Sequence, residues 1–154
     1  MKSTAPKSLL FLCLGNICRS MLARGIAQHT IEKRHLDLSV DGAGISAFHQ
    51  GEPAHPPIIK LARQHGIDIA HFTSKPITQA LADRFDWVVA MDCSNLQALR
   101  GLGITHPHVY KLGDFGLRGA DIPDPYTFTR AQDLERVYLM IERGVEELLT
   151  RCHV

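Results

Sequence analysis

The sequence predicts an α/β fold, a single three-layer domain with a four-stranded parallel sheet flanked by helices. Two observations predict this class. Short runs of strand-type apolar residues alternate along the chain with longer segments of helical periodicity, and most of the connections between them are short. Such alternation favours parallel strands covered by helices on both faces. The length of 154 residues is sufficient for one domain with a substantial core.

The elements follow one another in a regular order. Strands are predicted at Ser8–Leu12, Leu36–Val40, Phe85–Ala90 and His108–Leu112. Helices are predicted at Met21–Lys33, Pro57–His65, Ile77–Asp83, Ser94–Leu102 and Ala131–Leu149. Capping-box patterns at Ser94-x-x-Gln97 and Thr129-x-x-Gln132 support two of the helix starts. We expect residues 1–154 to form the single domain, with residues 1–6 as a flexible tail.

The composition excludes several classes of function. A formal net charge of +1 gives no basic footprint for nucleic acid or a membrane surface, so neither is an expected partner. Four scattered cysteines are too few for a secreted disulfide scaffold. The histidines form no ligand array, and His106-Pro-His108 is better explained as a surface turn than as a metal site. We therefore expect a cytoplasmic protein with no metal and no cofactor.

The most informative segment is the turn that follows the first strand. A cysteine, Cys13, ends the apolar run, and five residues later Arg19 precedes an amphipathic helix. Backbone N–H groups of a loop that enters a helix N-terminus point toward a bound anion, and the helix dipole favours negative charge there. The same field favours the thiolate form of a cysteine, and an arginine offers a planar fork of donors for two oxygens of a tetrahedral dianion. The turn therefore predicts a phosphate site with a thiolate nucleophile.

A Cys-x5-Arg spacing alone is a weak signal, and its simplest alternative is a core cysteine with an exposed arginine. The context and two further segments make it specific. The loop Cys13-Leu-Gly-Asn-Ile-Cys-Arg-Ser20 resembles the phosphate-binding loop of the low-molecular-weight protein tyrosine phosphatases. Asp121-Ile-Pro-Asp124-Pro125-Tyr126 is similar to the acid loop of that family, and Ala90-Met-Asp-Cys-Ser-Asn-Leu96 to its segment after the third strand.

The resemblance implies a protein tyrosine phosphatase that hydrolyses phosphotyrosine and small aryl phosphates through a phosphocysteine intermediate. Cys13 would be the nucleophile, Arg19 would hold the phosphate oxygens and Asp124 would be the general acid and then the base. Pro125 restricts Asp124 to an extended backbone and aims it from its loop. Asp121 and Asp92 are the other candidates for the acid, although Asp92 fits a cap or a supporting role better.

The resemblance also implies which residues bind the substrate. They are the loop residues Leu14, Gly15, Asn16, Ile17, Cys18 and Ser20, and the aromatic residues Phe48 and Tyr126. Within this set Asn16 would hold the strained loop and Ser20 would donate a hydrogen bond to the Cys13 thiolate. His71 would support the loop from behind. Three alternatives stay open here: Phe48 in the core, His71 as a surface turn residue, and Cys18 either as a redox-protective thiol or as a small buried hydrophobe.

The sequence departs from the family pattern behind the loop. Gly42 stands where a serine is usual, which removes a hydroxyl expected to support Asn16, and the stretch His71–Lys75 lacks an arginine often found there. Two other functions remain as alternatives: an arsenate reductase of the same fold, whose relay of extra cysteines is missing here, and a catalytically silent phosphate-binding module. A phosphotyrosine protein or small aryl phosphate is the expected substrate, with a tyrosine kinase system as an expected partner.

Overall fold

The structure, a computed structural model, describes residues 5–152. The strands are β1 (Ser8–Cys13), β2 (Ser39–Gly44), β3 (Trp87–Ala90) and β4 (Val109–Lys111). The helices are α1 (Arg19–Arg34), α2 (Pro56–Gln64), α3 (Gln79–Ala82), α4 (Cys93–Gly101) and α5 (Ala131–Cys152), with a short 3-10 turn at Leu112–Asp114. Strands and helices therefore alternate as the sequence predicts.

The four strands form one parallel sheet in the order β2-β1-β3-β4. The chain passes from β1 to β2 on one side and returns to β3 on the other, so the order reverses next to β1. Ligands of such sheets bind beyond the carboxyl ends of the strands at this reversal. Cys13 is the last residue of β1 and therefore lies at that place.

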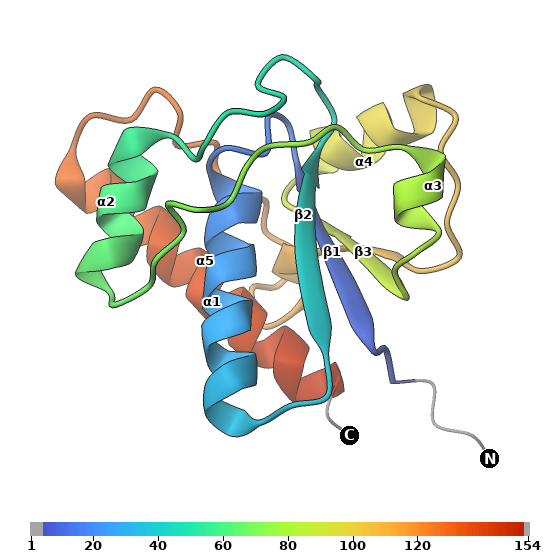
Figure 1. The fold of residues 1–154 in the computed structure, drawn as a ribbon, viewed down its shortest axis with the longest axis horizontal. Coiled ribbons are helices and arrows are strands. Elements are labelled where there is room, and N and C mark those ends of the chain that lie inside the picture. Colours follow the sequence, from blue (N-terminus) through green and yellow to red (C-terminus); the bar gives the residue numbers. More distant parts are fainter. Residues whose placement is uncertain (1–4, 153–154) are drawn as a thin grey trace.

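Alternate residues of β1 face opposite layers of the molecule. Leu9 and Phe11 belong to the larger core, which α1, α2 and α5 cover. Leu10 and Leu12 belong to a smaller core beneath α3 and α4. All four side chains are fully buried, and the two groups of helices lie on opposite sides of the sheet in Figure 1. The period of two along a strand explains why this apolar run has no polar face.

Most element boundaries differ from the sequence prediction by one to four residues, and the differences at β2 and α4 have a plain physical reason. The second strand begins at Ser39 rather than Leu36, because Leu36 and Leu38 pack against the larger core after α1 ends at the left-handed residue His35. The register pairs Ser39 with Ser8, and β2 then continues to Gly44. Helix α4 begins earlier than expected, at Cys93, because Asp92 and not Ser94 caps it.

The two ends of the described chain differ in part from the prediction. Of the expected tail at residues 1–6, residues 1–4 lie outside the described part, and Pro6 is buried. Helix α5 begins at Ala131 as predicted and extends past Leu149 to Cys152, although its first backbone acceptor is Arg130 rather than Thr129. Within residues 5–152, no helix has the length and apolar character needed to cross a bilayer.

Candidate active site

The loop between β1 and α1 has the geometry of an anion site. Asn16 adopts a left-handed conformation with φ of 55°, which turns the chain sharply between Cys13 and the helix. Asparagine is one of the residues that tolerate this region. Cys18, at the N-cap of α1, makes no side-chain capping bond, so its side chain satisfies none of the first N–H groups of the helix. Such unsatisfied donors, aligned with the helix dipole, favour an oxyanion.

A pocket of about 340 Å³ opens above this loop. Its floor and its walls come from three separate segments of the chain. Its lining residues are Cys13, Leu14, Gly15, Ile17, Cys18, Arg19, Ser46, Phe48, His49, Asp124 and Tyr126. The structure therefore brings most of the predicted site residues to one cavity, together with His49, the sequence neighbour of Phe48, and Ser46, which the sequence analysis did not select.

Cys13 lies in a buried hydrogen-bond chain at the floor of the pocket. Its Sγ is 3.0 Å from Ser20 Oγ, and Asn16 Nδ2 donates to the same Ser20 oxygen at 2.6 Å. All three residues are buried. Because Ser20 Oγ accepts a hydrogen bond from Asn16, its own O–H is available to donate to the Cys13 sulfur. This is the arrangement that the sequence predicts for Ser20.

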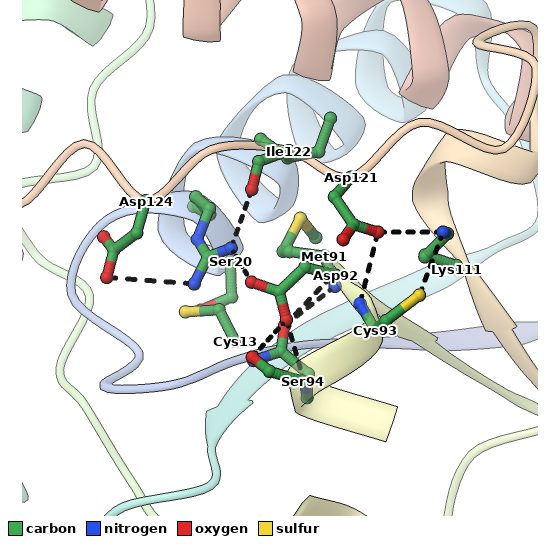
Figure 2. A network of polar contacts seen from close by, with 12 residues as sticks. Cys13, Ser20, Met91, Asp92, Cys93, Ser94, Lys111, Asp121, Ile122 and Asp124 are labelled. Carbon is green, nitrogen blue, oxygen red and sulfur yellow. Dashed lines mark hydrogen bonds and ion pairs between the residues drawn. The ribbon is translucent and has the colours of Figure 1, made fainter. Parts of the chain in front are cut away.

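Arg19 is almost fully buried beside the pocket, with 2% of its surface exposed. Its Nη1 donates to Asp92 Oδ2 at 2.6 Å and to the carbonyl of Ile122 at 2.8 Å, while Nη2 is 3.9 Å from Asp124 Oδ2 (Figure 2). Its Nε is buried and has no hydrogen-bond partner among the described residues. One edge of the guanidinium is therefore fixed by protein, and Nε remains able to donate to an oxygen in the pocket.

The three candidate carboxylates have different surroundings. Burial by itself would raise the pKa of Asp92, but hydrogen bonds from Arg19, Ser94 and the Asn95 N–H outweigh it and lower that pKa. Asp121 pairs with Lys111 at 2.8 Å and accepts the N–H of Cys93, and the Lys111 hydrogen bond lowers its pKa (Figure 2). Asp92 and Asp121 are therefore both occupied by structural contacts, Asp92 with Arg19 and Asp121 with Lys111.

Asp124 is placed differently. It lines the pocket with Cys13 and Arg19, and its side chain is 44% exposed. Its Oδ1 accepts the backbone N–H of Tyr126 at 3.1 Å, which fixes the carboxyl group at the start of the Asp-Pro-Tyr turn. Of the three carboxylates, Asp124 alone belongs to the pocket lining. The geometry therefore favours the sequence choice of Asp124 as the acid.

Aromatic rings form the wall opposite the loop. Phe48 is 82% exposed and contacts His49 edge to face, and the rings of His49 and His55 both pack against Tyr126. The alternative that placed Phe48 in the core is therefore wrong. His49 Nδ1 lies 3.2 Å from Glu52, which orients its ring over the pocket. His49 directly follows Phe48 in the sequence, and this position in the long segment after the second strand is the signal that points to it.

The comparisons with known proteins agree with this geometry. Residues 8–153 match the model of the low molecular weight phosphotyrosine protein phosphatase family. The chain is 35% identical to the low molecular weight protein-tyrosine-phosphatase YfkJ of Bacillus subtilis, over 92% of this chain and 93% of the relative. It belongs to this phosphatase family. The crystal structure of YfkJ superposes with a TM-score of 0.84 over 94% of this chain and 92% of the other.

Two relatives from fruit fly widen the comparison. Low molecular weight phosphotyrosine protein phosphatase 1 of Drosophila melanogaster is 35% identical over 86% of this chain and 88% of its own. The structure of a Drosophila arginine phosphatase matches with a TM-score of 0.83 and 29% identity, over 93% of this chain and 96% of the other. As a member of the family, the protein is a cysteine-dependent phosphatase. The arsenate reductase alternative is not favoured, because these relatives are named as phosphatases.

One predicted supporting residue is in the wrong place for its role. His71 is exposed and its ring packs edge to face against Phe72, away from the pocket lining. The residues that hold the phosphate loop come slightly later: Ser74 Oγ donates to the Gly15 carbonyl at 2.9 Å, and the Lys75 N–H donates to Asn16 Oδ1 at 3.1 Å. His71 and Ser74 lie in an irregular segment, and such a segment has no period that fixes which side chain faces inward.

Gly42 and Cys18 both lie close to the phosphate loop. A Cβ at Gly42 would lie 3.0 Å from Asn16 Nδ2, so the position at which the family usually has serine is indeed next to Asn16. Here Asn16 is held by Ser20 and Lys75 instead. Cys18 is 4% exposed, and its burial, with a smaller contribution from Cys13, raises the pKa of its thiol. The Cys18 side chain thus lines the pocket and stays a neutral thiol.

Within the described part of the chain, no three or more His, Cys, Asp or Glu side chains gather in a way that could hold a metal ion.

Proposed function

We propose that this protein hydrolyses phosphotyrosine and small aryl phosphates through a phosphocysteine intermediate on Cys13. The observation that carries the proposal is the meeting of Cys13, Arg19 and Asp124 at one pocket. A site that only bound phosphate would need neither a nucleophile nor an acid. The presence of both speaks against the silent binding module.

In the first step the Cys13 thiolate attacks phosphorus, and the P–O bond to the aryl group breaks. Arg19 Nε and the backbone N–H groups of the loop hold the equatorial oxygens as charge is redistributed among them. Asp124 gives its proton to the departing phenolate oxygen, whose parent phenol has a pKa of about 10. The products of this step are the free phenol, ionised Asp124 and phosphocysteine.

In the second step water attacks the phosphorus of phosphocysteine. Asp124, now a carboxylate, takes a proton from that water, the S–P bond breaks, and phosphate leaves with the Cys13 thiolate restored. Arg19 stays in place through both steps because Asp92 and the Ile122 carbonyl hold its other edge. The hydrogen bond from Ser20 to Cys13 stabilises the thiolate as the leaving group.

The aromatic wall supports an aryl substrate. Phe48 and Tyr126 are both exposed at the pocket, at 82% and 47%, and flat rings between them would bury surface on both sides. Leu14 and Ile17 add apolar surface to the lining. A phosphoarginine substrate, suggested by the arginine phosphatase relative, would bring a guanidinium group instead. The one carboxylate of the lining, Asp124, is already assigned to proton transfer.

We further propose that the substrate is a phosphotyrosine protein opposed by a tyrosine kinase, and that the protein acts in the cytoplasm. All four cysteines are free, which is usual in a reducing compartment.

The test is hydrolysis of p-nitrophenyl phosphate at mildly acid pH without added metal, with a phosphotyrosine peptide and phosphoarginine as further substrates. We expect Cys13→Ser to abolish turnover and Asp124→Ala to lower kcat by about 100-fold or more. Asp121→Ala is the matched control and should retain most activity, since Asp121 is outside the pocket lining. A folded wild type that binds vanadate but turns over none of these substrates would refute the proposal.

A further inference from the structure

Ser74 lies behind the phosphate loop and is distant from it in sequence. The residue is 3% exposed, and its Oγ donates to the backbone carbonyl of Gly15 at 2.9 Å across 59 residues of chain. Ser74 is not part of the pocket lining, whereas Gly15 is. The hydrogen bond therefore draws the Gly15 carbonyl to the side of the loop that faces away from the pocket.

The orientation of this carbonyl fixes the next N–H. A trans peptide group is planar, so the C=O of Gly15 and the N–H of Asn16 point in opposite directions. With the carbonyl held at the back, the Asn16 N–H faces the pocket. Among residues 5–152 this N–H has no backbone or side-chain acceptor. The left-handed φ of Asn16 makes the local chain strained, so the peptide plane depends on such an external hold.

Neighbouring contacts keep this hold rigid. The Lys75 N–H donates to Asn16 Oδ1, and Lys75 Nζ is paired with Asp41 at 2.6 Å. Gly44 lies directly behind the same peptide: a Cβ there would be 3.0 Å from the Gly15 carbonyl carbon. The peptide is thus enclosed by β2 and by the segment that contains Ser74.

Ser74 is also joined to the aromatic wall. Its backbone N–H donates to the carbonyl of Glu52 at 2.8 Å, and its carbonyl accepts the N–H of Gly51 at 2.8 Å. Glu52 in turn contacts His49, which lines the pocket beside Phe48. One residue therefore connects the loop that would hold phosphate with the wall that would hold the aryl ring.

We propose that Ser74 is a positioning residue: its hydroxyl sets the Gly15–Asn16 peptide so that the Asn16 N–H donates to a phosphate oxygen. The proposal rests on the proposed phosphate chemistry of the same pocket. It also accounts for how the loop is held although Gly42 offers no hydroxyl and the family arginine is missing from the stretch His71–Lys75.

The test compares Ser74→Ala with Ser74→Thr, which keeps the hydroxyl, and with the matched control Ser39→Ala at the exposed start of β2. The probe is inorganic phosphate, which is titrated into the protein. The readouts are its dissociation constant and the amide NMR signal of Asn16. Ser74→Ala loses the buried hydrogen bond from the Ser74 hydroxyl to the Gly15 carbonyl. We therefore expect it to bind phosphate about five- to tenfold more weakly, with a smaller change in the Asn16 amide signal during titration. Ser74→Thr should recover the binding, and Ser39→Ala should match wild type.

Unfolding by urea separates positioning from general stability. If Ser74→Ala lowers stability but leaves the phosphate constant and the Asn16 signal unchanged, the residue is structural and the proposal is wrong. Equal losses of binding in the alanine and threonine variants, both with wild-type stability, would also overturn it. Failure of the proposed function is distinguishable, because it would show as absent turnover in the wild type, independently of these phosphate titrations.

Discussion

Replacing Asp92 with alanine removes the cap of α4, including the hydrogen bond from Ser94, and the ion pair with Arg19. The Asp92 carboxylate accepts the Asn95 N–H as the cap of α4, and it pairs at 2.6 Å with the buried Arg19 guanidinium. Loss of a cap costs about 1 kcal/mol, and removal of one partner of a buried ion pair costs about 3–5 kcal/mol. Arg19 retains the Ile122 carbonyl and faces an open pocket, so the lower end applies. We expect a total loss of about 4 kcal/mol.

Asp92→Asn separates the two contributions. Asparagine is also a good N-cap through Oδ1, so this variant keeps the start of α4 but places an amide NH2 instead of a carboxylate oxygen beside Arg19, which loses both the charge and the hydrogen-bond acceptor. We expect it to lose about 3 kcal/mol, about 1 kcal/mol less than the alanine variant. Both variants should lose about 100-fold in kcat/KM, because the Arg19 fork is no longer held against the pocket.

The assay is urea unfolding at pH 7, followed by circular dichroism and by fluorescence of Trp87, the one tryptophan. A pH series adds a second check. The folded-state pKa of Asp92 is lowered, so its ionisation stabilises the fold above its ordinary value of about 3.9, and that stability is lost as pH falls through the lower folded value. Asp92→Asn should therefore lose less stability on acidification than wild type.

Two results would refute this reasoning. An alanine variant within about 1 kcal/mol of wild type would mean that Arg19 does not depend on Asp92. Equal stability of the alanine and asparagine variants would mean that the cap contributes nothing.

Three further outcomes are expected. Tyr126→Ala should raise KM for p-nitrophenyl phosphate about threefold to tenfold and leave KM for an alkyl phosphate unchanged, because only an aryl ring packs against this wall; equal changes would contradict it. Gly113→Ala should lower the urea unfolding free energy by about 3 kcal/mol or more, since a Cβ there would clash with the Ala120 carbonyl oxygen; a loss under about 1 kcal/mol would contradict it. Burial raises the pKa of the Cys18 thiol, so iodoacetamide at pH 7 should label exposed Cys93 well before Cys18 by mass spectrometry; equal rates would contradict it.

The parts of the fold that the sequence predicts well are those set by neighbouring residues. The apolar run that ends at Cys13 is buried on both faces, so it has no polar alternation and reads as a parallel strand. The start of β2 was harder to predict, because Leu36 and Leu38 have strand-like character but pack against helix-covered core after a turn. The start of α4 also differs by local detail: Asp92 caps the helix, whereas the sequence pattern predicts Ser94 as the cap.

In the candidate site, the choice among three aspartates shows what local pattern leaves open. Asp92, Asp121 and Asp124 all come from segments that resemble the family, and only their surroundings separate them: one holds Arg19, one pairs with Lys111, and Asp124 lines the pocket. The support of the phosphate loop is likewise left open by the local pattern: the sequence favours His71, and the structure places Ser74 there. Both lie in one irregular segment, where no repeat indicates which side chain turns inward.

The sequence by itself determined the strand, the tight loop from Cys13 to Ser20 and the helix that follows, because contiguous residues meet through local backbone geometry alone. It also determined the α/β class, since the alternation of apolar runs and helical periods is a property of the chain. Only the tertiary structure decided that Ser74, Asp92 and Asp124 reach that loop from segments more than fifty residues away. Such contacts depend on how the layers pack on the sheet, and packing brings together side chains that no spacing along the chain connects.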